Sequence, residues 1–185
     1  MTDWFETHDG IWNRLWQVLA TGVADAQHPA RRPTFATVSP QGWPEARTVV
    51  LRCADQQRAQ LTVHTDLFSD KITSLRANPR AALHVWDAEE ALQIRLQADV
   101  VIRSGDSTRA LWDRIPDHAQ QSYGVTPPPG TPIDTALAYA KSPDPASFAV
   151  LDCTVTSVDA VHLGSDHRRA RFSRARAWAG EWLSP

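Results

Sequence analysis

The chain has 185 residues, 42% of them hydrophobic and 22% charged, which is enough for one domain with a full hydrophobic core. Its 19 basic and 21 acidic residues leave a net charge of −2, so bulk electrostatics do not favour nucleic acid or an anionic membrane as a partner. No stretch approaches the roughly 18 consecutive apolar residues of a membrane-spanning helix.

The N-terminal sequence MTDWFETHDG has neither the basic nor the apolar region of a secretory leader. The two cysteines, Cys53 and Cys153, stand far apart and match no CxxC or metal-type spacing. We therefore expect a cytoplasmic protein with reduced thiols and a single domain over 1–185.

The first predicted element is an amphipathic helix over about 9–22, with Asp9 as its N-cap. It should pack on a sheet through a broad apolar stripe made of Ile11, Trp12, Leu15, Trp16, Val18 and Leu19. The proline-rich piece AQHPARRP ends this helix.

Four strands and a short helix are predicted next. The runs FATVS and ARTVVLR flank PQGWP, whose proline and glycine content indicates the turn of a hairpin. QLTVHT forms a third strand, and a turn over Asp66–Ser69 then leads into a helix capped by Ser69. Asn78-Pro79 ends that helix, and RAALHVW forms the fourth strand.

The clearest alternation runs from Leu92 to Arg103 and predicts a half-buried antiparallel strand, with Gln93 at the start of its polar face. From Ser104 to Gln121 the pattern turns helical, with Ser104 or Asp106 available as the cap. The three consecutive prolines of SYGVTPPPGTPI predict a rigid extended piece, and Ile133 to Lys141 should form a short helix. Together these segments make a helical and proline-rich insertion over about 104–142.

Two late strands, SFAVLDCTVTSVDAVHL and HRRARFSR, are separated by a turn over Gly164–Asp166 and lead into AWAGEWLSP. Six or seven antiparallel strands with few helices and no βαβ rhythm predict a mainly β fold, a small barrel with helices on its rim.

One compact unit collects candidate anion ligands, namely Arg47, Arg52, Thr65, Ser69 and Lys71. Lys71 lies in the first turn of the predicted helix, where unpaired N–H groups and the helix dipole favour a phosphate. No glycine-rich loop is present, so a nucleotide would not be bound as in a P-loop or Rossmann unit. The alternative is that these are ordinary surface cations.

Other chemistries have weaker support. The seven histidines form no HxxxH or HExxH pair, so no metal site is expected, and no GxSxG motif indicates a hydrolase. The basic run His167 to Arg176 is either a charged strand edge or an anion site. Its use for single-stranded nucleic acid conflicts with the acidic overall charge.

Six pieces follow one another in a recognisable order: RTVVLR, HTDLFSDK, NPRAALHVW, LQIRLQADVVI, HRRARF and WAGEWLSP. Together they resemble the pyridoxamine 5′-phosphate oxidase family of FMN-binding split barrels. The resemblance covers Phe35 to Val101 well and Phe148 to Pro185 in outline. It implies a split β-barrel and a homodimer with two FMN sites at the subunit interface, each built from both chains.

The resemblance also implies roles for single residues. Arg47 would lie near the FMN phosphate and Arg52 near the pyrimidine side of the ring, while Lys71 corresponds to a phosphate lysine. The implied cofactor contacts are Arg47, Thr48, Val49, Val50, Leu51, Arg52, His64, Thr65, Ser69, Lys71, Gln93, His162 and Arg171. The implied substrate contacts are Arg52, Arg114 and Arg168.

Several positions depart from the family pattern. Asp70 stands where the oxidases have a phosphate-binding arginine, for which Arg76 or a partner residue would compensate. The oxidases' substrate-orienting Arg-x-His falls on Arg168 to Ala170, so the histidine is missing. A family tryptophan aligns with His162, and a family arginine aligns near Phe172, or with Arg171 after a one-residue slip. FMN binding is therefore better supported than oxidation of pyridoxamine phosphate.

Two function classes follow. One is an FMN oxidoreductase acting on a vitamin B6 phosphate or another small molecule. The other is a flavin-binding or flavin-sequestering protein without B6 turnover. The incomplete substrate clamp around Arg168 is the feature that separates them.

Overall fold

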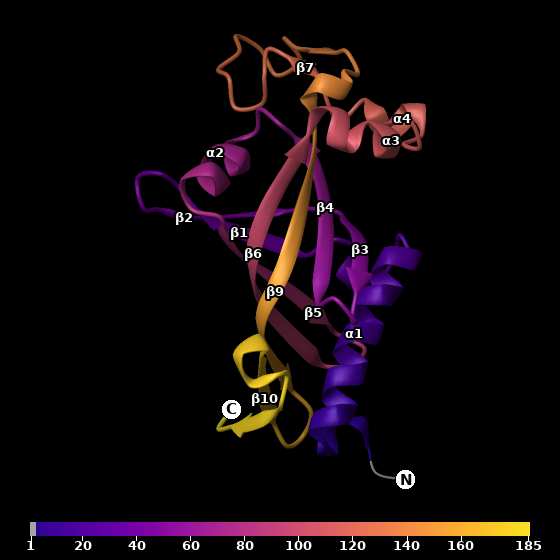
Figure 1. Ribbon diagram of the computed structural model, residues 1–185, viewed down its shortest axis with the longest axis vertical. Helices are drawn as coiled ribbons and strands as arrows, with labels where there is room; N and C mark the ends of the chain where they lie inside the picture. The colour runs from indigo at the N-terminus through magenta and orange to yellow at the C-terminus, as the bar shows by residue number, and fades with distance from the viewer. Residues whose placement is uncertain (1–2) are drawn as a thin grey trace.

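The computed structural model describes residues 3–185, and its centre is a nine-stranded antiparallel sheet (Figure 1). The strands of this sheet are β1 Thr34–Val38, β2 Pro44–Thr48, β3 Leu51–Asp55, β4 Gln60–Asp66, β5 Arg80–Asp87, β6 Leu92–Ser104, β9 Phe148–His162, β10 Arg168–Ser173 and β11 Glu181–Leu183. The helices longer than one turn are α1 His8–Ala24 and α2 Asp70–Ala77. No helix within 3–185 is long and apolar enough to cross a membrane.

The long strands β6 and β9 form the spine of the sheet and pair along nearly their whole length. The other edge of β9 is shared: β4 pairs with its first half, Phe148–Thr154, and β10 pairs with its second half, Ser157–His162. The sheet therefore branches at the middle of β9 and curls into an open, split barrel rather than a closed one. This confirms the predicted fold class.

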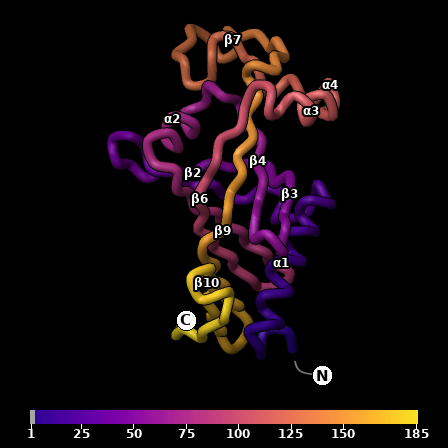
Figure 2. The backbone as a smooth tube through the Cα atoms, in the orientation of Figure 1, coloured from indigo at the N-terminus to yellow at the C-terminus, as the bar shows by residue number. Residues whose placement is uncertain are grey.

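Helix α1 runs along the lower part of the barrel beside β3 (Figure 1). Its buried side consists of Ile11, Leu15, Trp16, Val18, Leu19 and Gly22. The predicted cap Asp9 is wrong, because the N-cap lies two residues earlier, at Thr7, whose side chain accepts a hydrogen bond from the Gly10 N–H. Both ends of the described chain lie at this lower end (Figure 2).

The run ARTVVLR, predicted as one strand, is broken at Val49 and Val50. Its first part, β2, pairs with β1, whereas its second part, β3, pairs with β4. The Val49 N–H is bonded to the Pro33 carbonyl instead of a neighbouring strand. The break lets the chain pass from one side of the split barrel to the other, so Arg47 and Arg52 lie on two different strands, β2 and β3.

The insertion after β6 folds as short pieces: η3 Gly105–Thr108, α3 Arg109–Trp112, α4 Asp117–Gln120, and a small sheet of β7 Val125–Thr126 with β8 Ala140–Lys141. Neither Ser104 nor Asp106 caps η3 through its side chain. The helix predicted over 133–141 does not form, and all its residues are exposed. A short run with no surface to pack against gains too little to hold a helix.

Two hydrophobic clusters hold the fold. The main core fills the barrel beneath α1, with Phe35, Leu51, Leu61 and Leu83 among its fully buried members. A smaller cluster of Trp112, Tyr123, Phe148 and Val150 fixes the insertion to the upper ends of β4 and β9. The buried Asp66 carboxylate adds a tether, since it accepts the Gly124 N–H at 2.9 Å.

Candidate functional site

Four of the five predicted anion ligands, Arg47, Thr65, Ser69 and Lys71, meet at the upper end of the barrel, where β4 leads into α2, whereas Arg52 does not join them. The Lys71 Nζ donates to the Thr65 hydroxyl at 2.9 Å and to the Ser69 hydroxyl at 3.0 Å. Ser69 occupies the N-cap position of α2, but its side chain makes no capping bond and is turned toward Thr65 and Lys71. The first N–H groups of α2 are thus left without the side-chain acceptor that usually covers them.

Arg47 is the second cation of this cluster. It comes from β2, and its Nη1 donates to the Thr37 hydroxyl at 2.7 Å and to the Phe35 and Glu45 carbonyls. Burial and the nearby Arg47 guanidinium lower the pKa of Lys71 below the usual lysine value. An anion placed between the two cations would relieve this repulsion.

These features test whether FMN fits. Two partly buried cations, two hydroxyl groups and an uncapped eight-residue helix start converge on one spot, and all of them favour a bound phosphate. Asp70, in the first turn of α2, is exposed, and its carboxylate lies beside Gly130. The donor set therefore fits the phosphate group of FMN.

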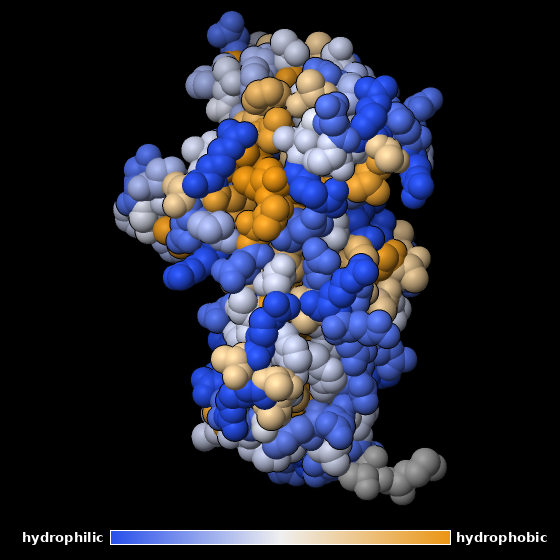
Figure 3. Space-filling view, in the orientation of Figure 1, coloured by the Kyte–Doolittle hydropathy of each residue, from blue (hydrophilic) through white to orange (hydrophobic). Residues whose placement is uncertain are grey.

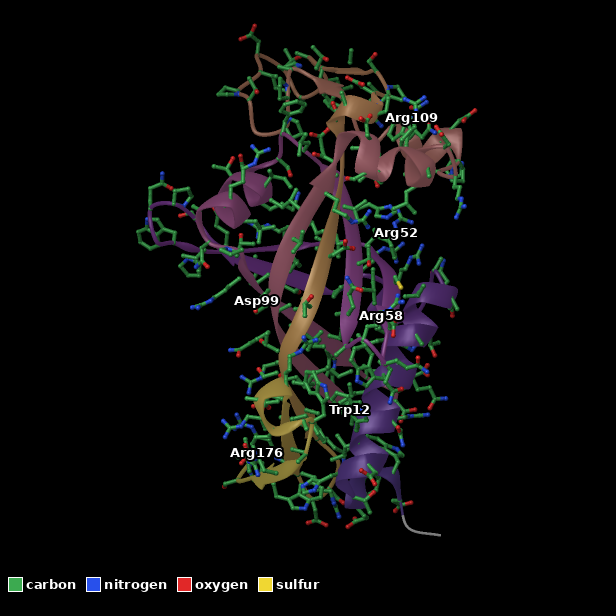
Figure 4. All side chains as sticks on the ribbon, in the orientation of Figure 1. Trp12, Arg52, Arg58, Asp99, Arg109 and Arg176 are labelled. Atoms are coloured by element: carbon green, nitrogen blue, oxygen red, sulfur yellow. The ribbon has the colours of Figure 1, made fainter. Side chains whose placement is uncertain are left out.

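Arg52 and His64 form a second cluster on the other side of β4, because adjacent residues of a strand face opposite ways and Thr65 belongs to the first cluster. The Arg52 Nε is buried without a hydrogen-bond partner in the described chain. Burial, with Arg52 and Arg103 nearby, lowers the pKa of His64 to about 4, so the imidazole is neutral at pH 7. Figure 4 shows Arg52 beneath the α3–α4 segment.

Gln93, His162, Arg168 and Arg171 lie at the opposite end of the barrel. Gln93 and Arg103 are ten residues apart on β6, which is about 33 Å of extended strand. Arg103 lies in register with His64 through Val150. Gln93 of one chain therefore cannot reach a flavin held at Lys71 and Arg52 of the same chain.

The strand register also separates residues that were predicted to act together. His162 is paired with Leu92 and Arg168, so these three side chains share one face of the sheet. Gln93 is paired with Val161 on the opposite face, and Arg171, paired with Asp159, lies on that same opposite face. Cross-strand partners point to the same face of a sheet. His162 and Arg171 thus lie on opposite faces, and the Phe172 position is filled by a core side chain that is 2% exposed.

The N-terminal segment covers His162, a contact that no local sequence pattern predicts. Phe5 stacks on the His162 ring at 4.3 Å with an interplanar angle of 6°. Glu6 forms an ion pair with Arg168, whose guanidinium also lies 4.8 Å from the Phe5 ring centre. Arg168 is therefore neutralised within the chain rather than left open for a substrate.

The remaining predicted contacts are scattered. Arg114 is exposed in the turn after α3, and Arg76 is exposed on α2. Arg171 is paired with Glu181 at 2.7 Å. Ala170 stands where the family has a histidine. Because Ala170 is fully buried, this position has no room for a larger side chain that could take over the role of the histidine.

The polar face of β5 and β6 carries two adjoining hollows. The larger, of about 600 Å³, is lined by Thr37, Asn78, Arg80, Gln97, Asp99 and Thr156 together with small apolar residues. The smaller, of about 330 Å³, shares Ala82 and Gln97 with it and reaches Arg171. The two hollows together form a groove along the sheet. One end of the groove is at Thr37, which is bonded to Arg47, and the other end is at Arg171.

A split barrel with an anion cluster at the start of α2 defines the class of FMN-binding split-barrel flavoproteins. Comparison with known proteins makes this specific. Residues 12–104 match the family model described as pyridoxamine 5′-phosphate oxidase, FMN-binding domain. The chain belongs to this family, and FMN is the cofactor of that domain.

Among curated relatives, the pyridoxine/pyridoxamine 5′-phosphate oxidase of Thermosynechococcus vestitus is 30% identical over 173 residues, 93% of this chain and 71% of that protein. The corresponding enzyme of Acaryochloris marina is 38% identical over 87 residues, 47% of this chain. The chain spans only 39% of the length of the latter relative.

Among solved structures, a pyridoxamine 5′-phosphate oxidase-related, FMN-binding protein from Nostoc punctiforme superposes with a TM-score of 0.77 at 27% identity, covering 94% of this chain and 96% of that one. PhzG from Burkholderia lata, solved with tetrahydrophenazine-1-carboxylic acid, gives a TM-score of 0.74 at 20% identity, covering 94% and 91%. The second match concerns the fold alone.

Proposed function

We propose that the chain is an FMN-dependent oxidoreductase of a small molecule, with the FMN phosphate held by Arg47, Thr65, Ser69 and Lys71. The observation that carries this proposal is the convergence of Lys71, two hydroxyls and the uncapped start of α2 beside Arg47. FMN, when bound, supplies the hydride-accepting ring.

The second cluster supplies the electrostatics for that chemistry. Reduction of a flavin places negative charge on the pyrimidine side of its ring, and a cation there favours the reduced form. Arg52 is suited to this task because its Nε is buried and unpaired within the described chain. Because the neighbouring His64 is neutral, it neither offsets the positive charge of Arg52 nor adds a second positive charge.

A homodimer is part of the proposal. Gln93 and Arg171 lie too far from Lys71 to serve one flavin within a chain, so a partner must bring them. The polar groove on β5 and β6 and an apolar patch over the upper ends of β6 and β9 (Figure 3), where Val101 is 60% exposed, offer the surface. The proposed assembly acts in the cytoplasm without nucleic acid or membrane, in keeping with the free Cys53 and Cys153.

A B6 phosphate is one candidate substrate. The buried Ala170 and the Glu6–Arg168 ion pair favour a second candidate function, a flavin-binding protein that does not turn over B6 phosphates. Neither Ala170 nor the paired Arg168 offers a free group that could orient such a substrate over the flavin.

Flavin fluorescence titration tests the proposal. Wild type should bind one FMN per chain, and the double variant Lys71→Ala, Arg47→Ala should lose saturable binding. Lys141→Ala, which removes the exposed lysine of β8, serves as the matched control and should bind as wild type. Anaerobic flavin bleaching with B6 phosphates, NADH and NADPH then separates the two functions, because a sequestering protein is not bleached by any of them.

A further inference from the structure

Arg47 presents its two terminal nitrogens differently. Nη1 is taken up by acceptors within the hairpin, the Thr37 hydroxyl and two backbone carbonyls, which fix the guanidinium in place. Nη2 makes a single contact, to the Glu45 carboxylate oxygen Oε2 at 3.0 Å. Nη2 is thus the edge on which an incoming anion would bind, and Glu45 already occupies it.

Glu45 is held there by α2 as well. The same oxygen, Oε2, accepts the Ser74 hydroxyl of α2 at 3.2 Å, and Ser74 also donates to the Asp70 carbonyl at 3.1 Å. The carboxylate therefore bridges β2 and the helix whose first turn carries Lys71. Its side chain is 36% exposed, so it can swing toward solvent without breaking the core.

The other acids near the cluster do not compete in this way. Both oxygens of Asp66 are committed to backbone N–H groups, of Phe68 and Gly124. Asp70 lies on the exposed side of α2 against Gly130. Among the described residues, Glu45 is the one carboxylate in an ion pair with Arg47.

We propose that Glu45 is an internal competitor of the FMN phosphate, a carboxylate that occupies the anion-binding edge of Arg47 in the flavin-free protein and must leave when FMN binds. This inference rests on the proposed function and deepens it. Glu45 becomes a residue that sets affinity and phosphate selectivity. Riboflavin has no phosphate and does not need the edge of Arg47, so its binding leaves Glu45 in place.

The test compares FMN with riboflavin. Glu45→Gln keeps the size and the Ser74 hydrogen bond but removes the charge that pairs with Arg47. The variant should bind FMN roughly two- to fivefold more tightly than wild type, the scale of a partly exposed ion pair that no longer has to be broken. Riboflavin affinity should stay unchanged, and Glu89→Gln, an exposed acid on the β5–β6 turn, should leave both affinities unchanged.

A second measurement uses inorganic phosphate and thermal unfolding of the flavin-free protein. Phosphate should raise the melting temperature of Glu45→Gln and Glu45→Ala more than that of wild type. Two results would overturn the inference alone, provided that wild type binds FMN. In the first, Glu45→Gln binds FMN equally tightly or more weakly than wild type; in the second, the variant gains affinity for riboflavin by the same factor as for FMN. Absence of saturable FMN binding in both proteins would overturn the proposed function and this inference together.

Discussion

Replacing Lys71 with methionine separates a cofactor ligand from a structural lysine. The methionine keeps the apolar stem and removes the ammonium, whose only hydrogen-bond partners within 3–185 are the Thr65 and Ser69 hydroxyls. Losing one charge-assisted phosphate contact should cost about 1.5 to 3 kcal/mol, roughly a ten- to hundredfold loss of FMN affinity. Riboflavin affinity should not change.

The flavin-free protein should tolerate the same change. Lys71 is partly desolvated and is repelled by Arg47, so its removal relieves an unfavourable charge. We expect the free energy of unfolding of Lys71→Met to lie within about 1 kcal/mol of wild type or above it. Urea unfolding without flavin measures this, with Lys141→Met as the control.

The pH dependence of wild type provides a further check. The folded-state pKa of Lys71 lies below its unfolded-state value, so between the two values the unfolded chain binds more protons and the flavin-free protein gains stability as pH rises. FMN needs the protonated amine, so its affinity should fall as pH rises through the folded-state pKa. The assignment of Lys71 as a phosphate ligand would be refuted if the Lys71→Met variant unfolds more easily than wild type and loses affinity for FMN and riboflavin equally.

Three further predictions concern assembly, substrate and protonation. Light scattering at micromolar concentration should show a dimer, and a monomer that binds FMN tightly would contradict the two-chain site. Pyridoxamine phosphate should bleach the bound flavin slowly or not at all, because Ala170 offers no orienting group; rapid bleaching with pyridoxal phosphate formation in air would show that another residue compensates. Because burial holds the pKa of His64 at about 4 against 6.5 when unfolded, stability should be lost as pH falls through that window. Urea unfolding at pH 7 and pH 5 should show a smaller loss for His64→Gln than for wild type, and equal losses would count against a neutral His64.

The sequence by itself determined the long strands β4, β5, β6 and β9, the start of α2 and the family. These depend on local signals: the alternation of Leu92 to Arg103, the Ser69 position before Lys71, and the turn residues between β1 and β2. Hydrophobic periodicity and chain-breaking residues act over a few positions, so they can be read without knowing what packs on what. The order of the motifs along the chain can likewise be recognised without a structure.

Only the tertiary structure decided which of these residues meet. The break at Val49 and Val50 arises because two different strands, β1 and β4, compete for one run of β-branched residues. The register of β9 with β10 put His162 and Arg171 on opposite faces, and a shift of one residue would have reversed this. Glu45 and Arg47 are two residues apart on β2, but the hydrogen bond from Ser74 to the same carboxylate depends on α2 docking beside β2. Long charged side chains choose partners from neighbours distant in sequence, and such contacts are fixed by packing rather than by any local pattern.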